Sequence, residues 1–150
     1  MTILKPGSPI PFFQAVLQDS TPISSSDLSS GKVIIYFYPQ DNTPTCIEEA
    51  CNLRDNYSSL IKAGYKLYGV SPDSMRKHQN FIKKFKLPFD LISDPSLSLI
   101  KKFRVWGPKL LFGRAYDGVL RTTFIIEDGI ILKIIDEVKS KKHADQILAD

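Results

Sequence analysis

The apolar residues of the first two thirds of the chain are grouped in a way that predicts buried strands alternating with helices. Val33 to Tyr38 is an unbroken run of β-branched and aromatic residues, which is typical of a strand buried on both faces. Two shorter apolar runs, at 66–70 and 89–92, indicate further strands. Between and after these strands the spacing is helical, and three helices are expected, at 43–63 with Gly64 as the stop signal, at 71–86 and at 94–103.

The last third of the chain predicts an antiparallel hairpin followed by a helix. Strand-like runs at 122–127 and 130–136 flank Asp128-Gly129, the strongest hairpin signal in the sequence, and a helix is expected from about Lys142 to the end. An alternating segment at 12–17 suggests a small hairpin near the N-terminus. These elements predict the α/β class, with a mixed central sheet flanked by helices on both faces and a short N-terminal β extension. A thioredoxin-like fold fits this order, and we expect one domain over residues 1–150.

The composition does little to narrow the function. With 43% hydrophobic and 24% charged residues, the chain has the make-up of an ordinary globular protein. The net charge of +4 comes from scattered lysines, so a nucleic-acid partner is not expected. No apolar stretch approaches the ~20 residues that span a bilayer, and the first residues lack the pattern of a secretory signal. We therefore expect a cytoplasmic protein without a membrane partner.

The two cysteines of the chain, Cys46 and Cys51, are the strongest candidates for chemistry. In a reducing compartment a close cysteine pair is more often catalytic or metal-binding than architectural. Pro44 suits the first position of a helix, which places Thr43 at the N-cap and Cys46 in the first turn. Unpaired backbone N–H groups and the helix dipole favour a thiolate there, and the thiolate is the nucleophilic form. The alternative is that Cys46 is a buried packing residue.

The spacing of the two cysteines suggests a redox switch. On an intact helix they are separated by ~7.5 Å of rise and ~140° of rotation, whereas a disulfide needs Cα atoms roughly 4.4–6.8 Å apart. The helix must therefore unwind locally before the sulfurs can join, unlike the C-x-x-C pair of a dithiol oxidoreductase. A zinc site is disfavoured, because the chain offers only these two cysteines and two histidines, His78 and His143, which lie on different predicted helices. Both histidines are expected to be surface or capping residues, and no metal or other cofactor is expected.

The sequence around the cysteines resembles a known family. Pro39-x-x-x-Thr43-x-x-Cys46 is similar to the active-site motif of the peroxiredoxins. Further segments resemble the peroxiredoxin Q subfamily, also called bacterioferritin comigratory protein, and they extend over nearly the whole chain. They include Phe37-Tyr38-Pro39, Asp41-Asn42-Thr43-Pro44, Glu49-Ala50-Cys51, Gly69-Val70-Ser71-Pro72-Asp73, Ser93-Asp94-Pro95, Trp106-Gly107 and Arg121-Thr122-Thr123-Phe124.

This resemblance implies a thiol peroxidase. Cys46 would be the peroxidatic cysteine, which attacks hydrogen peroxide or an organic hydroperoxide and becomes a sulfenic acid. Cys51 would be the resolving cysteine, which forms an intramolecular disulfide that thioredoxin or a similar dithiol protein reduces. The subfamily resemblance also implies a monomer or a weak dimer. Two alternatives remain on the same fold, namely a protein disulfide oxidoreductase and a peroxide-sensing module.

The resemblance also implies roles for four supporting residues. Pro39 would shield the site, Thr43 would hydrogen-bond the peroxide, Arg121 would place a guanidinium beside the thiolate, and Glu49 would hold that arginine. An arginine stays charged at any relevant pH, so it can favour a thiolate and the charge that develops as the O–O bond breaks. Without the resemblance, Arg121 could not be chosen over the other arginines of the chain.

Two positions depart from the subfamily pattern, and four aromatic residues can be interpreted in two ways. Thr45 stands where the subfamily commonly has Gly, and Gln40 replaces a frequent Lys. These changes are expected to affect rate and substrate range rather than the presence of peroxidase activity. The aromatic residues are expected either to line an apolar approach to the cysteine or to belong to the core, and they are Tyr36, Trp106, Phe112 and Tyr116.

Overall fold

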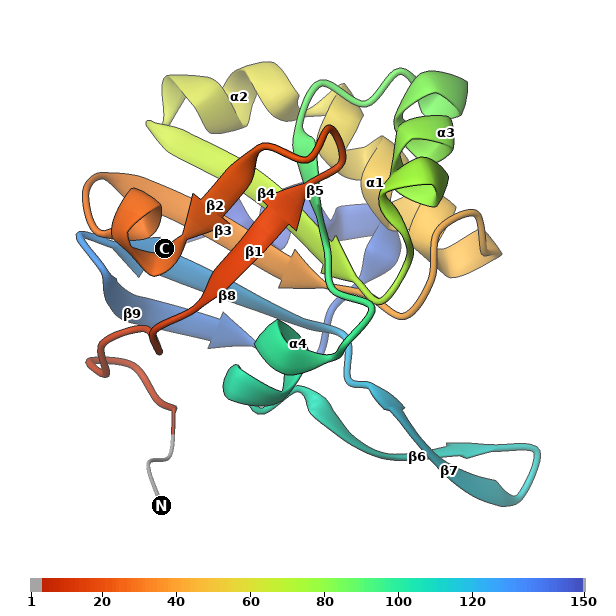
Figure 1. Cartoon of the computed structure of the whole chain (residues 1–150). Helices are drawn as coiled ribbons and strands as arrows, with labels where there is room; N and C mark the ends of the chain where they lie inside the picture. Colours follow the sequence, from red (N-terminus) through yellow and green to blue (C-terminus); the bar gives the residue numbers. More distant parts are fainter. Residues whose placement is uncertain (1–3, 150) are drawn as a thin grey trace.

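A computed structural model describes residues 4–149, and a mixed seven-stranded sheet lies at its centre (Figure 1). The strand order across the sheet is β2-β1-β5-β4-β3-β8-β9. The strands are β1 (Gln14–Leu17), β2 (Pro22–Ser24), β3 (Lys32–Phe37), β4 (Tyr65–Ser71), β5 (Asp90–Ser93), β8 (Thr122–Glu127) and β9 (Ile130–Ile135). The interior strand β3 pairs parallel with β4 and antiparallel with β8, which makes the sheet mixed as predicted.

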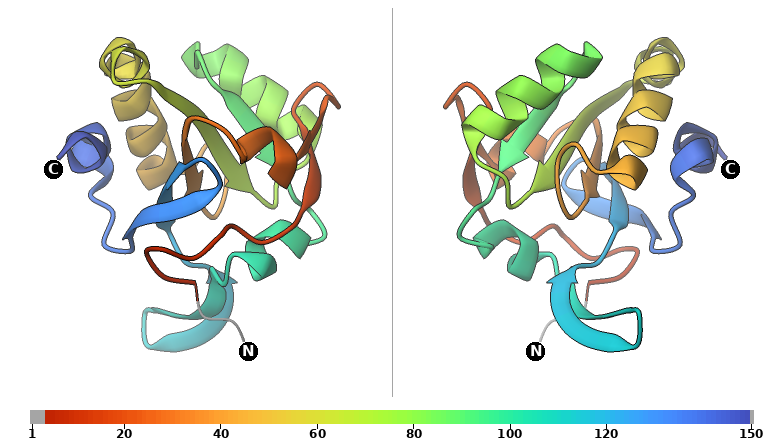
Figure 2. Two further views of the ribbon diagram at one scale, coloured as in Figure 1. Left: turned by 90° about the vertical axis from the view of Figure 1, so that its left-hand side faces the viewer. Right: turned by 90° about the vertical axis from the view of Figure 1, so that its right-hand side faces the viewer.

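Helices cover both faces of this sheet (Figure 2). The α-helices are α1 (Pro44–Asp55), α2 (Tyr57–Lys62), α3 (Met75–Phe85), α4 (Ser98–Lys102) and α5 (His143–Leu148), with short 3-10 turns η1 (Ser25–Leu28) and η2 (Ser140–Lys142). Apolar residues of α1, α2, α3 and α5 pack into one buried cluster, and those of α4 pack into a second cluster across the sheet. The predicted α/β class and thioredoxin-like arrangement are therefore confirmed. Among the described helices, none is long and apolar enough to cross a membrane.

The helix expected over 43–63 is interrupted, and two other helices begin later than expected. At Asn56 the backbone leaves the helical region, and the side-chain Nδ2 of Asn56 donates to the carbonyl of Asn52 at 2.8 Å. This hydrogen bond takes up a carbonyl of the last turn of α1, and α2 starts at the next residue. Helix α3 begins after Ser74, whose side chain caps it. Asp94 precedes α4, and its carboxylate accepts hydrogen bonds from two backbone N–H groups in the first turn of α4. Asp94 therefore stabilises the start of that helix without being part of it.

A second, two-stranded sheet was not predicted and projects from the body of the molecule (Figure 1). Strands β6 (Trp106–Leu111) and β7 (Arg114–Val119) form it as an antiparallel hairpin. Phe112 is 97% exposed at its tip and Tyr116 is 45% exposed, so the interpretation of these two as core residues is wrong. Tyr36, by contrast, is a core residue at 1% exposure.

The expected hairpin at the N-terminus and the one near the C-terminus are both present. Strands β1 and β2 pair antiparallel at the edge of the main sheet, and β1 joins it through β5. Strands β8 and β9 pair antiparallel around Asp128-Gly129, where both residues have positive φ angles. Strand β8 follows the projecting hairpin in the chain and pairs antiparallel with β3, with Thr122 opposite Phe37 at the end of β3.

Candidate active site

Cys46 lies in the first turn of α1, where the sequence placed it. Pro44 is the first helical residue and Thr43 is the N-cap with extended backbone. The side chain of Thr43 makes no capping hydrogen bond, because its Oγ1 donates instead to the carbonyl of Gln40 at 3.1 Å. The N–H groups of the first turn therefore have no side-chain cap, and they leave a positive helix end beside the sulfur. Cys46 itself is only 2% exposed.

Arg121 contacts both Cys46 and Glu49, using a different guanidinium nitrogen for each. Its Nη2 donates to Cys46 Sγ at 3.2 Å, and its Nη1 donates to Glu49 Oε1 at 2.6 Å. Burial alone would lower the pKa of Arg121, but the negative charges of Glu49 and Cys46 outweigh it and leave this pKa above its usual value. The guanidinium therefore stays positive beside the sulfur and favours the thiolate.

Glu49 connects this arginine to a histidine that the sequence analysis expected at the surface. Its Oε2 lies 3.0 Å from Nδ1 of His143 in α5, an ion-pair distance without the alignment of a good hydrogen bond. The other ring nitrogen of His143 lies 2.7 Å from Oγ1 of Thr123. Glu49 and His143 are both completely buried. The expectation that His143 lies at the surface is therefore wrong, although it does stand at the C-cap of η2.

Cys51 lies on the same helix as Cys46, and both cysteines are free. Cys51 is half-buried, and the helix between the two residues is continuous. The structure thus contains the intact-helix arrangement in which the sulfurs are separated. The local unwinding that would join them stays a prediction.

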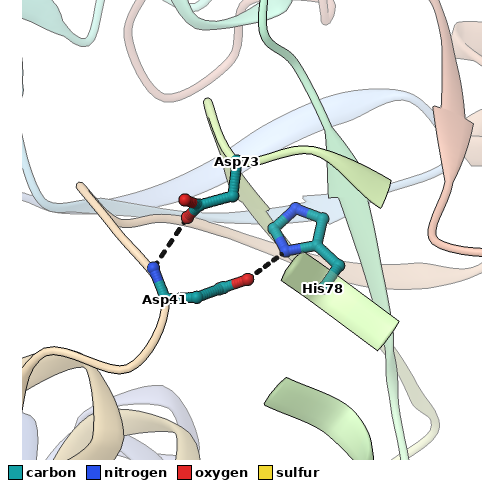
Figure 3. Close-up of side chains that lie close together, drawn as sticks. All are labelled: Asp41, Asp73 and His78. Atoms are coloured by element: carbon teal, nitrogen blue, oxygen red, sulfur yellow. Dashed lines mark hydrogen bonds and ion pairs between the residues drawn. The ribbon is translucent and has the colours of Figure 1, made fainter. Parts of the chain in front are cut away.

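A buried hydrogen-bond network holds the loop that leads into α1 (Figure 3). The carboxylate of Asp41 accepts from the hydroxyl of Tyr38 at 2.6 Å and lies 2.7 Å from Nδ1 of His78. The backbone N–H of Asp41 donates to Asp73 Oδ2 at 2.7 Å. Burial, with the nearby Tyr36 and Asp41, raises the pKa of Tyr38 well above its usual value, so its hydroxyl remains a donor. His78 is completely buried, so the expectation of a surface histidine is wrong here too.

Asp41, Asp73 and His78 are close enough to hold a metal ion, but their atoms are already engaged. Their candidate ligand atoms lie within 4.8 Å of one another. Both carboxylate oxygens of Asp41 have partners, Asp73 Oδ2 also accepts from the hydroxyl of Ser71, and His78 Nε2 lies 3.0 Å from the carbonyl of Ile92. These contacts make the donor set a hydrogen-bond network that fixes the loop.

Of the remaining expected site residues, Pro39 and Thr43 lie in this loop and are half-buried. The side chains of Gln40 and Thr45, the two departures from the subfamily pattern, are exposed. Helix α1 begins at Pro44 and has Thr45 in its first turn.

Lys109 is a further cation of the site that sequence reasoning missed. It lies on β6, donates from Nζ to the carbonyl of Val119 at 2.9 Å and is half-buried. Burial lowers the pKa of Lys109, and the positive charge of Arg121 lowers it further, whereas Cys46 raises it. A surface cavity of about 630 Å³ runs past Lys109 and Arg121, and its lining is mainly apolar, including Leu120, Phe124 and Val138. Because the projecting hairpin was not predicted, nothing in the sequence placed Lys109 here.

Comparisons with known proteins agree on one family. The AhpC/TSA family matches residues 6–134 of the chain. A putative peroxiredoxin bcp of Haemophilus influenzae is 42% identical over 149 residues, which cover 99% of this chain and 96% of that protein. The solved structure of a cysteine-to-serine mutant of Xylella fastidiosa PrxQ superimposes with a TM-score of 0.90 at 28% identity, over 99% of this chain and 95% of that one.

A further solved structure comes from work on the alkyl peroxide reduction activity of the bacterioferritin comigratory protein of Xanthomonas campestris. It superimposes with a TM-score of 0.84 at 33% identity and covers 91% of this chain and 88% of that one. Sequence and structure comparisons therefore lead to the same group of proteins that the motif around Cys46 resembles.

Proposed function

This chain belongs to the AhpC/TSA family and is a thiol peroxidase of the peroxiredoxin type, and from that premise we propose which of its residues perform the reaction. Cys46 is the peroxidatic cysteine. The observation that carries this assignment is the contact of 3.2 Å between Arg121 Nη2 and Cys46 Sγ at the first turn of α1. A fixed cation and an uncapped helix end act on the same sulfur and favour its ionised, nucleophilic form.

In the first step, the Cys46 thiolate attacks the terminal oxygen of a hydroperoxide. An S–O bond forms as the O–O bond breaks. The electron pair of the O–O bond leaves with the second oxygen of the peroxide, which takes up a proton and departs as water or an alcohol. Arg121 stabilises the negative charge on the departing oxygen. Thr43 hydrogen-bonds the peroxide and Pro39 shields the sulfur. Both residues are half-buried in the loop before α1, which supports these roles.

In the second step, Cys51 resolves the sulfenic acid on Cys46. The segment between them unwinds, the sulfur of Cys51 attacks the sulfur of Cys46, and water leaves as the disulfide forms. The continuous helix between the free cysteines supports this order, because attack by Cys46 needs the helix end and disulfide formation needs its loss.

An external dithiol protein of the thioredoxin type then reduces the disulfide by exchange and returns both thiols. The peroxide can be hydrogen peroxide or an organic hydroperoxide. The mainly apolar cavity that Arg121 helps to line supports the second class, because it offers space for an alkyl group beside the guanidinium that contacts the sulfur. The Xanthomonas campestris relative, with its alkyl peroxide reduction activity, supports it as well.

We further propose that residues 1–150 act as one peroxidase domain, as a monomer or weak dimer in the cytoplasm, without a nucleic-acid or membrane partner. The main sheet supports a single unit, since it joins strands from Gln14 to Ile135. The two free cysteines suit a reducing compartment.

Substitution of each cysteine tests the assignment. Cys46→Ser is expected to abolish peroxide consumption in the presence of a thioredoxin system, because no nucleophile remains. Cys51→Ser is expected to consume about one peroxide per chain and then stop, because the sulfenic acid has no partner in the chain. Peroxide loss and free thiols are counted on the same samples. Unchanged consumption by Cys46→Ser would refute the assignment.

A further inference from the structure

One buried side chain of the site, His143, has no part in the reaction as proposed above. It contacts Glu49 across 3.0 Å and Thr123 across 2.7 Å, and it is completely buried on α5. Through Glu49 it belongs to a chain of contacts that ends at the reacting sulfur, since Glu49 holds Arg121 at 2.6 Å and Arg121 holds Cys46 at 3.2 Å.

The charges in this series of contacts show what His143 contributes. When Cys46 is a thiolate, the site holds two anions, Cys46 and Glu49, and the guanidinium of Arg121 contacts both. A buried carboxylate is costly unless each oxygen has a partner. Oε2 of Glu49 accepts no hydrogen bond from the described residues, and Nδ1 of His143, at 3.0 Å, is the ring nitrogen that faces it, so a proton on Nδ1 would be attracted to the ionised carboxylate. With one oxygen of Glu49 facing His143, the other faces Arg121, and this orients Nη2 of the guanidinium toward the sulfur.

The position of Glu49 in the chain adds a second consequence. Glu49 lies between Cys46 and Cys51, in the segment that must unwind before the disulfide can form. His143 and Arg121 lie outside that segment, on α5 and just before β8. Unwinding therefore pulls Glu49 away from both partners, and the two contacts oppose it.

We propose that His143 is a positioning residue that latches Glu49 in place, so that Arg121 is aimed at Cys46 and α1 stays wound until the sulfenic acid has formed. This inference rests on the proposed function. Its distinctive consequence is that losing the latch slows the attack on peroxide and accelerates the resolution by Cys51. A side chain that served only packing would not change the two steps in opposite directions.

Two substitutions of His143 separate its two contacts. In His143→Asn the amide nitrogen lies as many bonds from Cα as Nδ1 does, so it can still face Glu49. In His143→Gln the amide nitrogen corresponds to Nε2, so it can still reach Thr123 but not Glu49. Rapid mixing with hydrogen peroxide, followed by acid quench and mass spectrometry, measures sulfenic acid formation and disulfide formation as separate rates. For His143→Gln we expect attack to slow about tenfold and resolution to accelerate about threefold, with His143→Asn within about twofold of the unsubstituted chain in both steps.

Ile147→Val is the matched control, because Ile147 is a buried residue of the same helix and packs in the apolar cluster that contains Cys46 and Ala50. It is expected to lower thermal stability without the opposite changes in rate. The latch is overturned if His143→Gln slows both steps together, or if His143→Asn behaves like His143→Gln. If the unsubstituted chain forms no sulfenic acid, the proposed function itself fails; if it does and His143→Gln keeps its rates, only the latch fails.

Discussion

Arg121 uses the planar fork of its guanidinium to reach the sulfur of Cys46 and the carboxylate of Glu49 at the same time. A lysine ammonium carries the same charge, but it is a single point on a flexible stem and cannot reproduce two contacts in a fixed plane. The role proposed for Arg121 therefore depends on shape as well as charge.

Arg121→Lys is expected to slow the attack on hydrogen peroxide by about 10²–10³-fold, the range found when one preorganised donor to a developing negative charge is lost. Stopped-flow measurement of the first oxidation step checks this. Arg114→Lys is the matched control, because Arg114 is exposed on the projecting hairpin and should leave the rate unchanged. Equal rates for Arg121→Lys and the unsubstituted chain would contradict the role of the guanidinium.

The position of a single residue could be predicted from the sequence where it depends only on its neighbours along the chain. Pro44 at the first helical position places Cys46 in the first turn by helix chemistry alone, and the structure agrees. Arg121 is 75 residues away from its sulfur partner, so only the family resemblance could select it. The two histidines were misjudged for the same reason, because their burial depends on partners such as Asp41, Glu49 and Thr123 that other elements supply.

At the scale of elements, the loop before α1 and the helix itself are restrained differently. Asp41 in the loop is tied to α3 through His78 and to the segment between β4 and α3 through Asp73. Asn42, the next residue, has a φ of 63°, and α1 begins two residues further on. The network therefore fixes the near end of the segment, and we expect unwinding to be confined to residues beyond Asn42.

A double-mutant cycle on Asp41→Ala and His78→Ala tests whether the network acts as a unit. Each single substitution leaves a buried polar partner unsatisfied, so each should lower the free energy of unfolding by about 2–4 kcal/mol. The double variant should lose less than the sum, with a coupling of about 1–3 kcal/mol in denaturant titrations. Asp145, which is exposed on α5, gives the additive control pair with His78. Full additivity of Asp41 and His78 would show that the contact carries no energy.

The projecting hairpin and the break at Asn56 were not predicted, because neither leaves a periodic pattern of apolar residues in the sequence. Strands β3, β4, β5, β8 and β9 lie close to their predicted ranges because their apolar residues fill a core. The projecting hairpin exposes residues 112–117, so no alternation of apolar and polar residues marks its strands. The break at Asn56 depends on one side-chain hydrogen bond, which helix periodicity cannot reveal.

At the scale of the whole molecule, the sheet assembles the site from distant parts of the chain. Strand β8 pairs antiparallel with β3, and Thr122 and Thr123 lie opposite Phe37 and Tyr36. This pairing brings Arg121 next to the end of β3, from which the loop leads directly to Cys46. The alternation of elements predicted a mixed sheet, but the order of its strands, and hence the meeting of Arg121 with Cys46, follows from tertiary pairing that local patterns do not contain.

The central claim is that Cys46 reacts with peroxide and then joins Cys51 within one chain. It is tested most directly by treating the reduced protein with one equivalent of hydrogen peroxide, blocking free thiols and cleaving with a glutamate-specific protease. Glu48 and Glu49 lie between the cysteines, so cleavage puts Cys46 and Cys51 on different fragments, which only a disulfide can hold together. The account predicts the loss of both thiols and one linked pair of fragments from a chain of monomer mass. Two free thiols after treatment, or a disulfide between separate chains, would contradict it.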